Sequence, residues 1–241
     1  MSRKVWRKAS YPESVLTRKL ILFDIDGTLL YAGKTPSEVF AESIGFIIGK
    51  TVEFPKQIFF GRTDTFIIRE MLRQHLATPA DGEYHRIREH FIHSMKERFP
   101  HSDDGFLIPG VREYLDTLKN ESDIHLGLVT GNFKETAFVK LSRFGLDEYF
   151  ETGGFGDEAE DRQELLRQAV EKATRHYGKC FSSEQIVVIG DTLHDIHSAH
   201  HWGYRSVAVS HIRNKDTLLE GKPDILIENY MGLKGSQCLF E

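Results

Sequence analysis

Three short runs of mainly apolar residues constrain the fold of this 241-residue chain most, and a polar residue follows each run directly or after one glycine. They cover residues 20–23, 124–129 and 186–189. Strands that are apolar throughout, and not only at alternate residues, are typical of a parallel sheet covered on both faces. Two shorter runs, residues 207–209 and 225–227, predict further strands of the same sheet.

Helical patterns lie between these strands. Apolar residues recur at helical spacing over residues 111–118 and 137–144, and most clearly within residues 161–177. Strand–helix alternation of this kind predicts an α/β fold with a doubly wound parallel sheet, similar to a Rossmann fold.

Residues 32–107 interrupt the alternation. This stretch contains three helix-start signals: a capping box with Pro36 at Thr35–Glu38, Thr63 followed by Asp64, and Thr78 followed by Pro79. We therefore expect an inserted helical cap.

The chain should accordingly divide into three parts. Residues 18–31 and 108–241 would form the α/β core, residues 32–107 the cap, and residues 1–17 an N-terminal arm. The arm is rich in Lys and Arg, so a solvated segment, an anionic contact and an organelle address are all open interpretations.

Composition excludes several classes of protein. The net charge of -5, from 31 basic and 36 acidic residues, argues against a nucleic-acid-binding protein. We expect no membrane partner either, because no apolar run approaches the roughly 18–20 residues of a membrane span. The two cysteines, Cys180 and Cys238, favour a reducing compartment, and we predict a cytoplasmic protein.

The first two strands are followed by polar residues that can take part in chemistry. Asp24 and Asp26 are two positions apart in an extended segment and point the same way. Thr130, Gly131 and Asn132 come after the second strand, where a hydroxyl and free backbone amides at a helix start suit phosphate oxygens. Ligands of open α/β sheets bind beyond these strand ends.

The third strand is followed by two more carboxylates, Asp191 and Asp195. Each motif alone has an ordinary explanation as a helix cap, a turn or a calcium-like loop. Their order along the chain, each after an apolar strand, favours one shared site over these separate explanations. Four acids that face one another would repel, so they imply a bound divalent cation, and all-oxygen ligands suit Mg²⁺.

These motifs resemble those of the haloacid dehalogenase (HAD) superfamily. Residues 24–29 (DIDGTL) are similar to its first motif, residues 130–132 to its second and residues 190–195 to its fourth. The resemblance extends over about residues 19–230. The insert resembles the helical type 1 cap of the phosphoglycolate phosphatase and β-phosphoglucomutase branch.

The resemblance implies a role for each residue of the first two motifs. Asp24 would attack phosphorus and become an aspartyl phosphate. Asp26 would protonate the leaving alcohol and then activate water, which favours an oxygen leaving group and thus a phosphate ester. Thr130 would hold phosphoryl oxygens together with the backbone around Gly131 and Asn132.

The resemblance also implies a set of Mg²⁺ ligands. Asp191 would bind the ion together with the Asp24 carboxylate and the Asp26 carbonyl. Asp195 would either bind the ion itself or support the residues that do.

The third motif of the family is a basic residue near the helix before the fourth motif, usually Lys. Arg162 stands at the start of the helix within residues 161–177, and we favour it for this role. Lys172 and Lys179 are the alternatives, and a solvated surface position is the ordinary explanation of Arg162.

Two further features have a functional and an ordinary interpretation. Arg62, between two cap helices, could contact an anionic substrate, or residues 61–64 could be a simple helix entry. His194, His197 and His201 recur on one helix face, which could bind a transition metal but is more typical of a polar surface.

The sequence therefore predicts a Mg²⁺-dependent phosphatase that hydrolyses small phosphate monoesters. The alternatives are a phosphomutase acting on a sugar phosphate and a catalytically idle binding or regulatory protein. We expect a small phosphorylated metabolite as substrate and a monomer or homodimer. No motif indicates which phosphate ester is bound.

Overall fold

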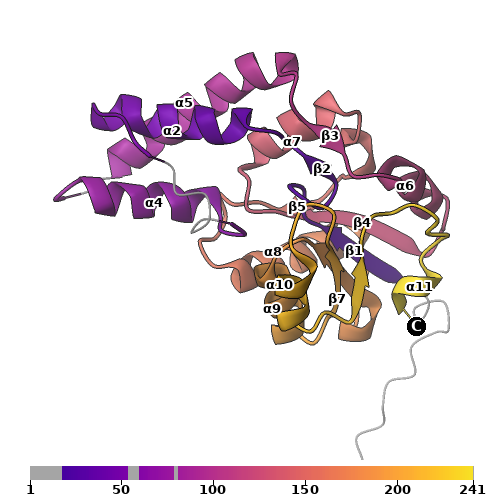
Figure 1. The fold of residues 1–241 in the computed structure, drawn as a ribbon. Coiled ribbons are helices and arrows are strands. Elements are labelled where there is room, and N and C mark those ends of the chain that lie inside the picture. The colour runs from indigo at the N-terminus through magenta and orange to yellow at the C-terminus, as the bar shows by residue number, and fades with distance from the viewer. Residues whose placement is uncertain (1–17, 54–59, 79–80, 241) are drawn as a thin grey trace, which may run out of the picture.

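A six-stranded parallel sheet forms the centre of the molecule (Figure 1). The computed structural model describes residues 18–53, 60–78 and 81–240. The strand order is β5-β4-β1-β6-β7-β8. The strands are β1 (Lys19–Phe23), β4 (Ile124–Val129), β5 (Gly153–Gly154), β6 (Ile186–Gly190), β7 (Arg205–Val209) and β8 (Ile225–Ile227).

Strand β1 lies in the middle of the sheet and pairs with β4 on one side and β6 on the other. The chain builds β4 and β5 on the first side and then crosses to build β6, β7 and β8 on the second. This reversal of strand order opens a crevice beyond the carboxyl end of β1, as in other doubly wound sheets. The predicted fold class is confirmed.

Helices cover both faces of the sheet (Figure 1). Ile21 and Phe23 of β1 pack in one apolar cluster with α6 (Val111–Lys119) and α7 (Lys134–Arg143). Leu20 and Leu22 pack in another with α8 (Arg162–Tyr177) and α9 (Leu193–His201). These four side chains are all buried, which explains the continuous apolar run. The helices around the sheet are α6 (Val111–Lys119), α7 (Lys134–Arg143), α8 (Arg162–Tyr177), α9 (Leu193–His201), α10 (Lys215–Glu220) and α11 (Gln237–Phe240), with short 3₁₀ turns η1 (Phe99–His101), η2 (Asp147–Tyr149) and η3 (Ser183–Gln185).

Three helices form a separate layer beside the sheet (Figure 1). They are α2 (Thr35–Ile48), α4 (Asp64–His75) and α5 (Asp81–Arg98). The chain enters this layer through β2 (Leu30–Tyr31) and leaves it through β3 (Phe106–Leu107), and the two strands pair antiparallel. Phe40 and Phe91 join α2 to α5 edge to face, with ring centroids 4.4 Å apart.

The starts of these helices agree only partly with the sequence signals. Thr63 caps α4 as expected, because its side-chain oxygen accepts from Phe66 N at 3.2 Å. Thr35 is not an N-cap. Helix α2 already includes it, and Asp104 accepts hydrogen bonds from the Lys34 amide and, at 3.1 Å, from Thr35 Oγ1. A carboxylate from the returning strand segment therefore replaces the local capping box.

The signal at Thr78 and Pro79 is a different case. Helix α5 begins at Asp81, and Pro79 lies outside the described residues.

Asp64, the first residue of α4, joins the helical layer to the core. Its amide donates to Gly131 O at 2.7 Å, and its Oδ2 accepts from Phe133 N at 2.9 Å. Burial raises the pKa of Asp64 from 3.8 to about 7, although Lys140 lowers it in part. The carboxyl group is therefore held at a contact where its charge is poorly solvated.

This contact predicts a pH-dependent stability. Because the folded-state pKa is the higher one, the stabilising contribution of Asp64 is complete below pH 4 and is lost as the pH rises through about 7. Asp64→Asn removes the charge and keeps an acceptor for Phe133 N. The unfolding free energy of the variant minus that of wild type, measured by urea denaturation, should increase by about 1–2 kcal/mol from pH 5 to pH 8.

Asp81→Asn is the matched control, because Asp81 also begins a helix of this layer but is exposed. It should show no such gain. An equal stability difference between Asp64→Asn and wild type at both pH values would contradict the assignment.

Candidate active site

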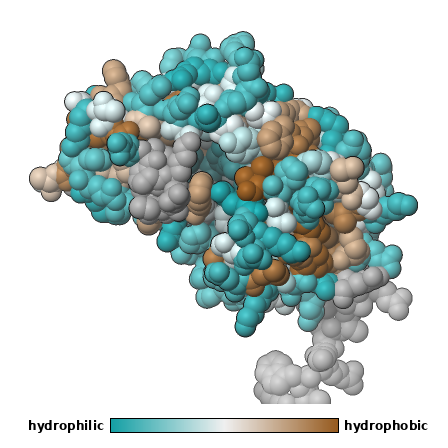
Figure 2. Space-filling model, viewed as in Figure 1, coloured by the Kyte–Doolittle hydropathy of each residue, from teal (hydrophilic) through white to brown (hydrophobic). Residues whose placement is uncertain are grey.

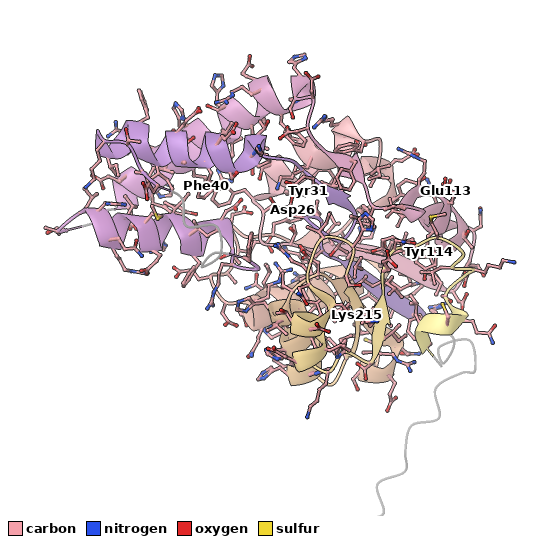
Figure 3. All side chains as sticks on the ribbon, viewed as in Figure 1. Asp26, Tyr31, Phe40, Glu113, Tyr114 and Lys215 are labelled. Carbon is pink, nitrogen blue, oxygen red and sulfur yellow. The ribbon has the colours of Figure 1, made fainter. Side chains whose placement is uncertain are left out.

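The polar residues after three neighbouring strands meet at one edge of the sheet. Asp24 follows β1, Thr130 follows β4 and Asp191 follows β6. Because β4, β1 and β6 are adjacent and parallel, their carboxyl ends lie together. Asp26 and Tyr31 lie where the core meets the helical layer that carries Phe40 (Figure 3).

Asp24, Asp191 and Asp195 form a buried acidic cluster. One carboxylate oxygen of each lies within 4.8 Å of the others. Burial raises the pKa of Asp24 to about 6, with Arg162 opposing and Asp195 adding to the rise. Burial likewise raises the pKa of Asp191 well above its usual value, against the effect of Arg213.

The donor set of this cluster fits Mg²⁺. All three residues offer carboxylate oxygens, the ligands that this ion prefers. Asp191 Oδ1 is buried and has no hydrogen-bond partner among the described residues, which leaves an oxygen for a cation. Asp26 is expected to bind the ion through its backbone carbonyl, and its carboxylate accepts a hydrogen bond from Lys140.

Arg162 is the basic residue beside Asp24. It is the first residue of α8, and Asp161 caps that helix by accepting from two backbone amides. Arg162 Nη2 lies 3.2 Å from Asp24 Oδ1 and also binds Asp195 Oδ1. Its Nη2 donates further to the Val129 carbonyl at 3.2 Å, which fixes the guanidinium between β4 and the acids.

The two alternatives for the third motif have other partners. Lys172 pairs with Glu158, and Lys179 Nζ lies 3.4 Å from His125 Nε2. Of the three candidates, the structure therefore brings Arg162 to the predicted nucleophile.

The loop after β4 carries a network of short polar contacts. Asn132 Nδ2 donates to Thr130 Oγ1 at 2.8 Å and to Asp26 Oδ2 at 2.7 Å. A Cβ atom at Gly131 would stand 2.3 Å from the Arg62 carbonyl oxygen, so only glycine fits between this loop and the start of α4.

Lys140 belongs to the same network and was missed in the sequence. It lies on α7, and its Nζ is 2.6 Å from Asp26 Oδ2 and 2.6 Å from Asn132 Oδ1. Its position three residues after Ala137 and one before Leu141 places it on the apolar face of the helix. A lysine within an apolar stripe of a helix indicates a buried charge, and this pattern is visible in the sequence.

Arg213 was also missed. It lies in the loop after β7, where its Nε donates to Asp191 Oδ2 at 2.7 Å and its guanidinium stacks 3.9 Å from the ring centroid of Phe60. The sequence predicts a strand at residues 207–209, so the polar residues after it are open to the same reasoning as those after the other strands.

A cavity of about 410 Å³ joins these groups. The surface is hollowed between the helical layer and the core on the face shown in Figure 2. The helical layer contributes Phe40, Ile67 and Phe91 to the wall. Eight predicted site residues line the cavity together: Asp24, Asp26, Arg62, Thr130, Gly131, Asn132, Arg162 and Asp191.

Arg62 reaches this cavity from the loop before α4. Its guanidinium lies over the Phe66 ring, 4.9 Å from the centroid. The preceding glycine stands close to Thr192 and His194, so the loop packs against the start of α9. Arg62 thus belongs to the cavity wall, and Thr63 caps α4 as in an ordinary helix entry, so both interpretations have structural support.

The histidines of α9 do not form a second metal centre. Within the described ranges, the acidic cluster is the one group of ligand atoms close enough to hold an ion. His200 instead contacts Ser206 and Asp224.

Among the described residues, every helix is too short or too polar to cross a membrane. Cys180 and Cys238 are both free and exposed.

Comparison with known proteins identifies the family. The family model described as "Haloacid dehalogenase-like hydrolase" matches residues 21–209. Pyrophosphatase PpaX of Halalkalibacterium halodurans is 27% identical over 217 residues, which are 87% of this chain and 92% of that protein.

Solved structures show the same fold. The crystal structure of CbbY from Rhodobacter sphaeroides in complex with phosphate has a TM-score of 0.70 and 20% identity over 92% of this chain and 99% of that one. A predicted phosphoglycolate phosphatase from Haemophilus somnus has a TM-score of 0.63 and 21% identity over 89% and 95%.

The expected superfamily and enzyme class, a phosphatase of the HAD type, are thus confirmed by the family model and by relatives named for such activities. The chain belongs to the haloacid dehalogenase-like hydrolase family.

Proposed function

We propose that this protein is a Mg²⁺-dependent phosphatase that hydrolyses small phosphate monoesters through an aspartyl phosphate on Asp24. The observation that carries the proposal is the position of Asp24. It lies at the carboxyl end of the central strand, lines the cavity, belongs to the acidic cluster and stands 3.2 Å from Arg162.

The residues around Asp24 can divide the reaction between them. A carboxylate attacks an anionic phosphate only when positive groups neutralise the phosphoryl oxygens. Arg162 holds the attacking carboxylate in place. Thr130 and the backbone around Gly131 and Asn132 bind the phosphoryl oxygens, and Asp26 gives a proton to the leaving oxygen and later takes one from water.

Mg²⁺ would be held by Asp24, Asp191, Asp195 and the Asp26 carbonyl, and when bound it supplies positive charge for the phosphoryl oxygens. Asp195 also accepts from Thr192 N at 3.1 Å and from Thr192 Oγ1 at 2.7 Å, which fixes its orientation. Thr192 thus orients one of the proposed ligands.

We further propose that residues 32–107 act as a cap over the site. The cavity of about 410 Å³ lies between this helical layer and the core, a size that suits a small metabolite. Arg62 would bind an anionic part of the substrate. The relatives named pyrophosphatase make a diphosphate a sensible first compound in a substrate screen. The two free cysteines fit a cytoplasmic location.

Asp24→Asn should abolish turnover. An amide cannot attack phosphorus, so hydrolysis of p-nitrophenyl phosphate with Mg²⁺ should fall by at least about 10³-fold. Mass spectrometry of acid-quenched wild-type enzyme should find a phosphoryl group on the peptide that contains Asp24. Activity in Asp24→Asn equal to wild type would refute the mechanism.

Removal of Mg²⁺ should abolish activity reversibly. We expect a chelator to stop hydrolysis and added Mg²⁺ to restore it. Independently of activity, Mg²⁺ should raise the melting temperature of the wild type, because an ion that binds only the folded state stabilises it. Asp191→Asn should lose this thermal shift. A metal-free enzyme with full activity would contradict the proposal.

Arg162 should be separable from the other basic candidates. Arg162→Ala should lower kcat about 10²- to 10³-fold, in the range found when one charge-stabilising donor is removed. Arg162→Lys should recover part of the loss. Lys172→Ala and Lys179→Ala are the controls and should stay near wild type, with circular dichroism confirming the fold. A full loss in either control would move the role to that lysine.

A further inference from the structure

Lys140 is a buried cation without a role in the reaction described so far. Only 5% of its side chain is exposed, and it projects from the apolar face of α7. Burying an ammonium group is costly unless polar partners replace water. Here the partners are the Asp26 carboxylate and the Asn132 amide oxygen, each at 2.6 Å.

The contacts on Asp26 are asymmetric. Lys140 Nζ and Asn132 Nδ2 both donate to the same oxygen, Oδ2, at 2.6 and 2.7 Å. Asn132 is held in turn, because Lys140 donates to its Oδ1 and its own Nδ2 also donates to Thr130 Oγ1. The Asp26 side chain lines the cavity and is 38% exposed.

We propose that Lys140 is a positioning residue for Asp26. By fixing Oδ2 together with Asn132, it orients the carboxyl group so that Oδ1 faces the leaving oxygen of the substrate. This inference rests on the proposed function, in which Asp26 exchanges a proton with the leaving group. A lysine suits the place because one compact ammonium can donate to two acceptors at once.

The basic residues of the site then have separate tasks. Arg162 binds Asp24 and Asp195, the acids of the nucleophile and the metal cluster. Lys140 binds Asp26, the acid that acts on the leaving group. Loss of Lys140 should therefore weaken proton transfer to the leaving oxygen and leave the attack on phosphorus largely intact.

This division can be measured through the leaving group. Proton donation matters little when the leaving group is a good one, such as p-nitrophenolate, and much when it is a poor one, such as phenolate. The ratio of kcat/KM for p-nitrophenyl phosphate to kcat/KM for phenyl phosphate reports how strongly the reaction depends on proton donation to the leaving group. It does so because kcat/KM covers the steps up to release of the alcohol.

Lys140→Met should raise that ratio at least about tenfold over wild type, in the same direction as Asp26→Asn. Lys140→Arg, which keeps the charge, should return the ratio towards wild type. Lys134→Met is the control, since Lys134 is an exposed residue of the same helix, and it should leave the ratio unchanged. If Lys140→Met fails to fold, the ratio for Lys140→Gln decides in its place.

Two results would overturn the inference. An equal loss on both substrates would mean that Lys140 binds the phosphoryl group or only supports the fold, and no loss would mean that it has no part in the reaction. The proposed function fails separately, if Asp26→Asn itself shows no dependence on the leaving group.

Discussion

Burial of negative charge at the end of β1 is the constraint on which the rest of the site depends. Asp24, Asp191 and Asp195 are each less than a tenth exposed, and their oxygens face one another. Desolvation and mutual repulsion both oppose ionisation of such a group. A carboxylate can act as a nucleophile there only if cations from elsewhere in the fold compensate it.

Those cations come from separate elements of the structure. Arg162 begins α8, Lys140 projects from α7, and Arg213 lies in the loop after β7. Arg162 pairs with Asp24 and Asp195, Arg213 pairs with Asp191, and Lys140 pairs with the neighbouring Asp26. The charge balance of the site therefore depends on the packing of helices on both faces of the sheet, which links the fold to the reactivity of one aspartate.

The sequence was most informative where local pattern and burial coincide. The main strands are apolar because both faces of the sheet are covered, and the acids at their ends follow directly in the chain. Lys140 and Arg213 escaped notice because their partners are far away in sequence: Lys140 lies 114 residues from Asp26. The local sequence around Lys140 does not indicate Asp26 as its partner, and the sequence around Arg213 does not indicate Asp191.

The failures at the helical layer have the same origin. The capping box at Thr35 was a sound local signal, but Asp104 arrives from 69 residues away and occupies that role. Strands β2, β3 and β5 have two residues each, too few for any periodicity. Strand β5 forms beside β4, whereas β2 and β3 pair only with each other, and neither pairing can be predicted from the local sequence.

The pairing of β2 with β3 has a consequence for how such a molecule can evolve. Because Leu30 is the partner of Leu107, the two ends of the intervening segment are neighbours. The segment is therefore attached to the core in the same way as a short loop. Helices can then be gained, lost or exchanged at this point with little disturbance of the sheet. Changes of the proposed cap then leave the acidic cluster at the strand ends intact.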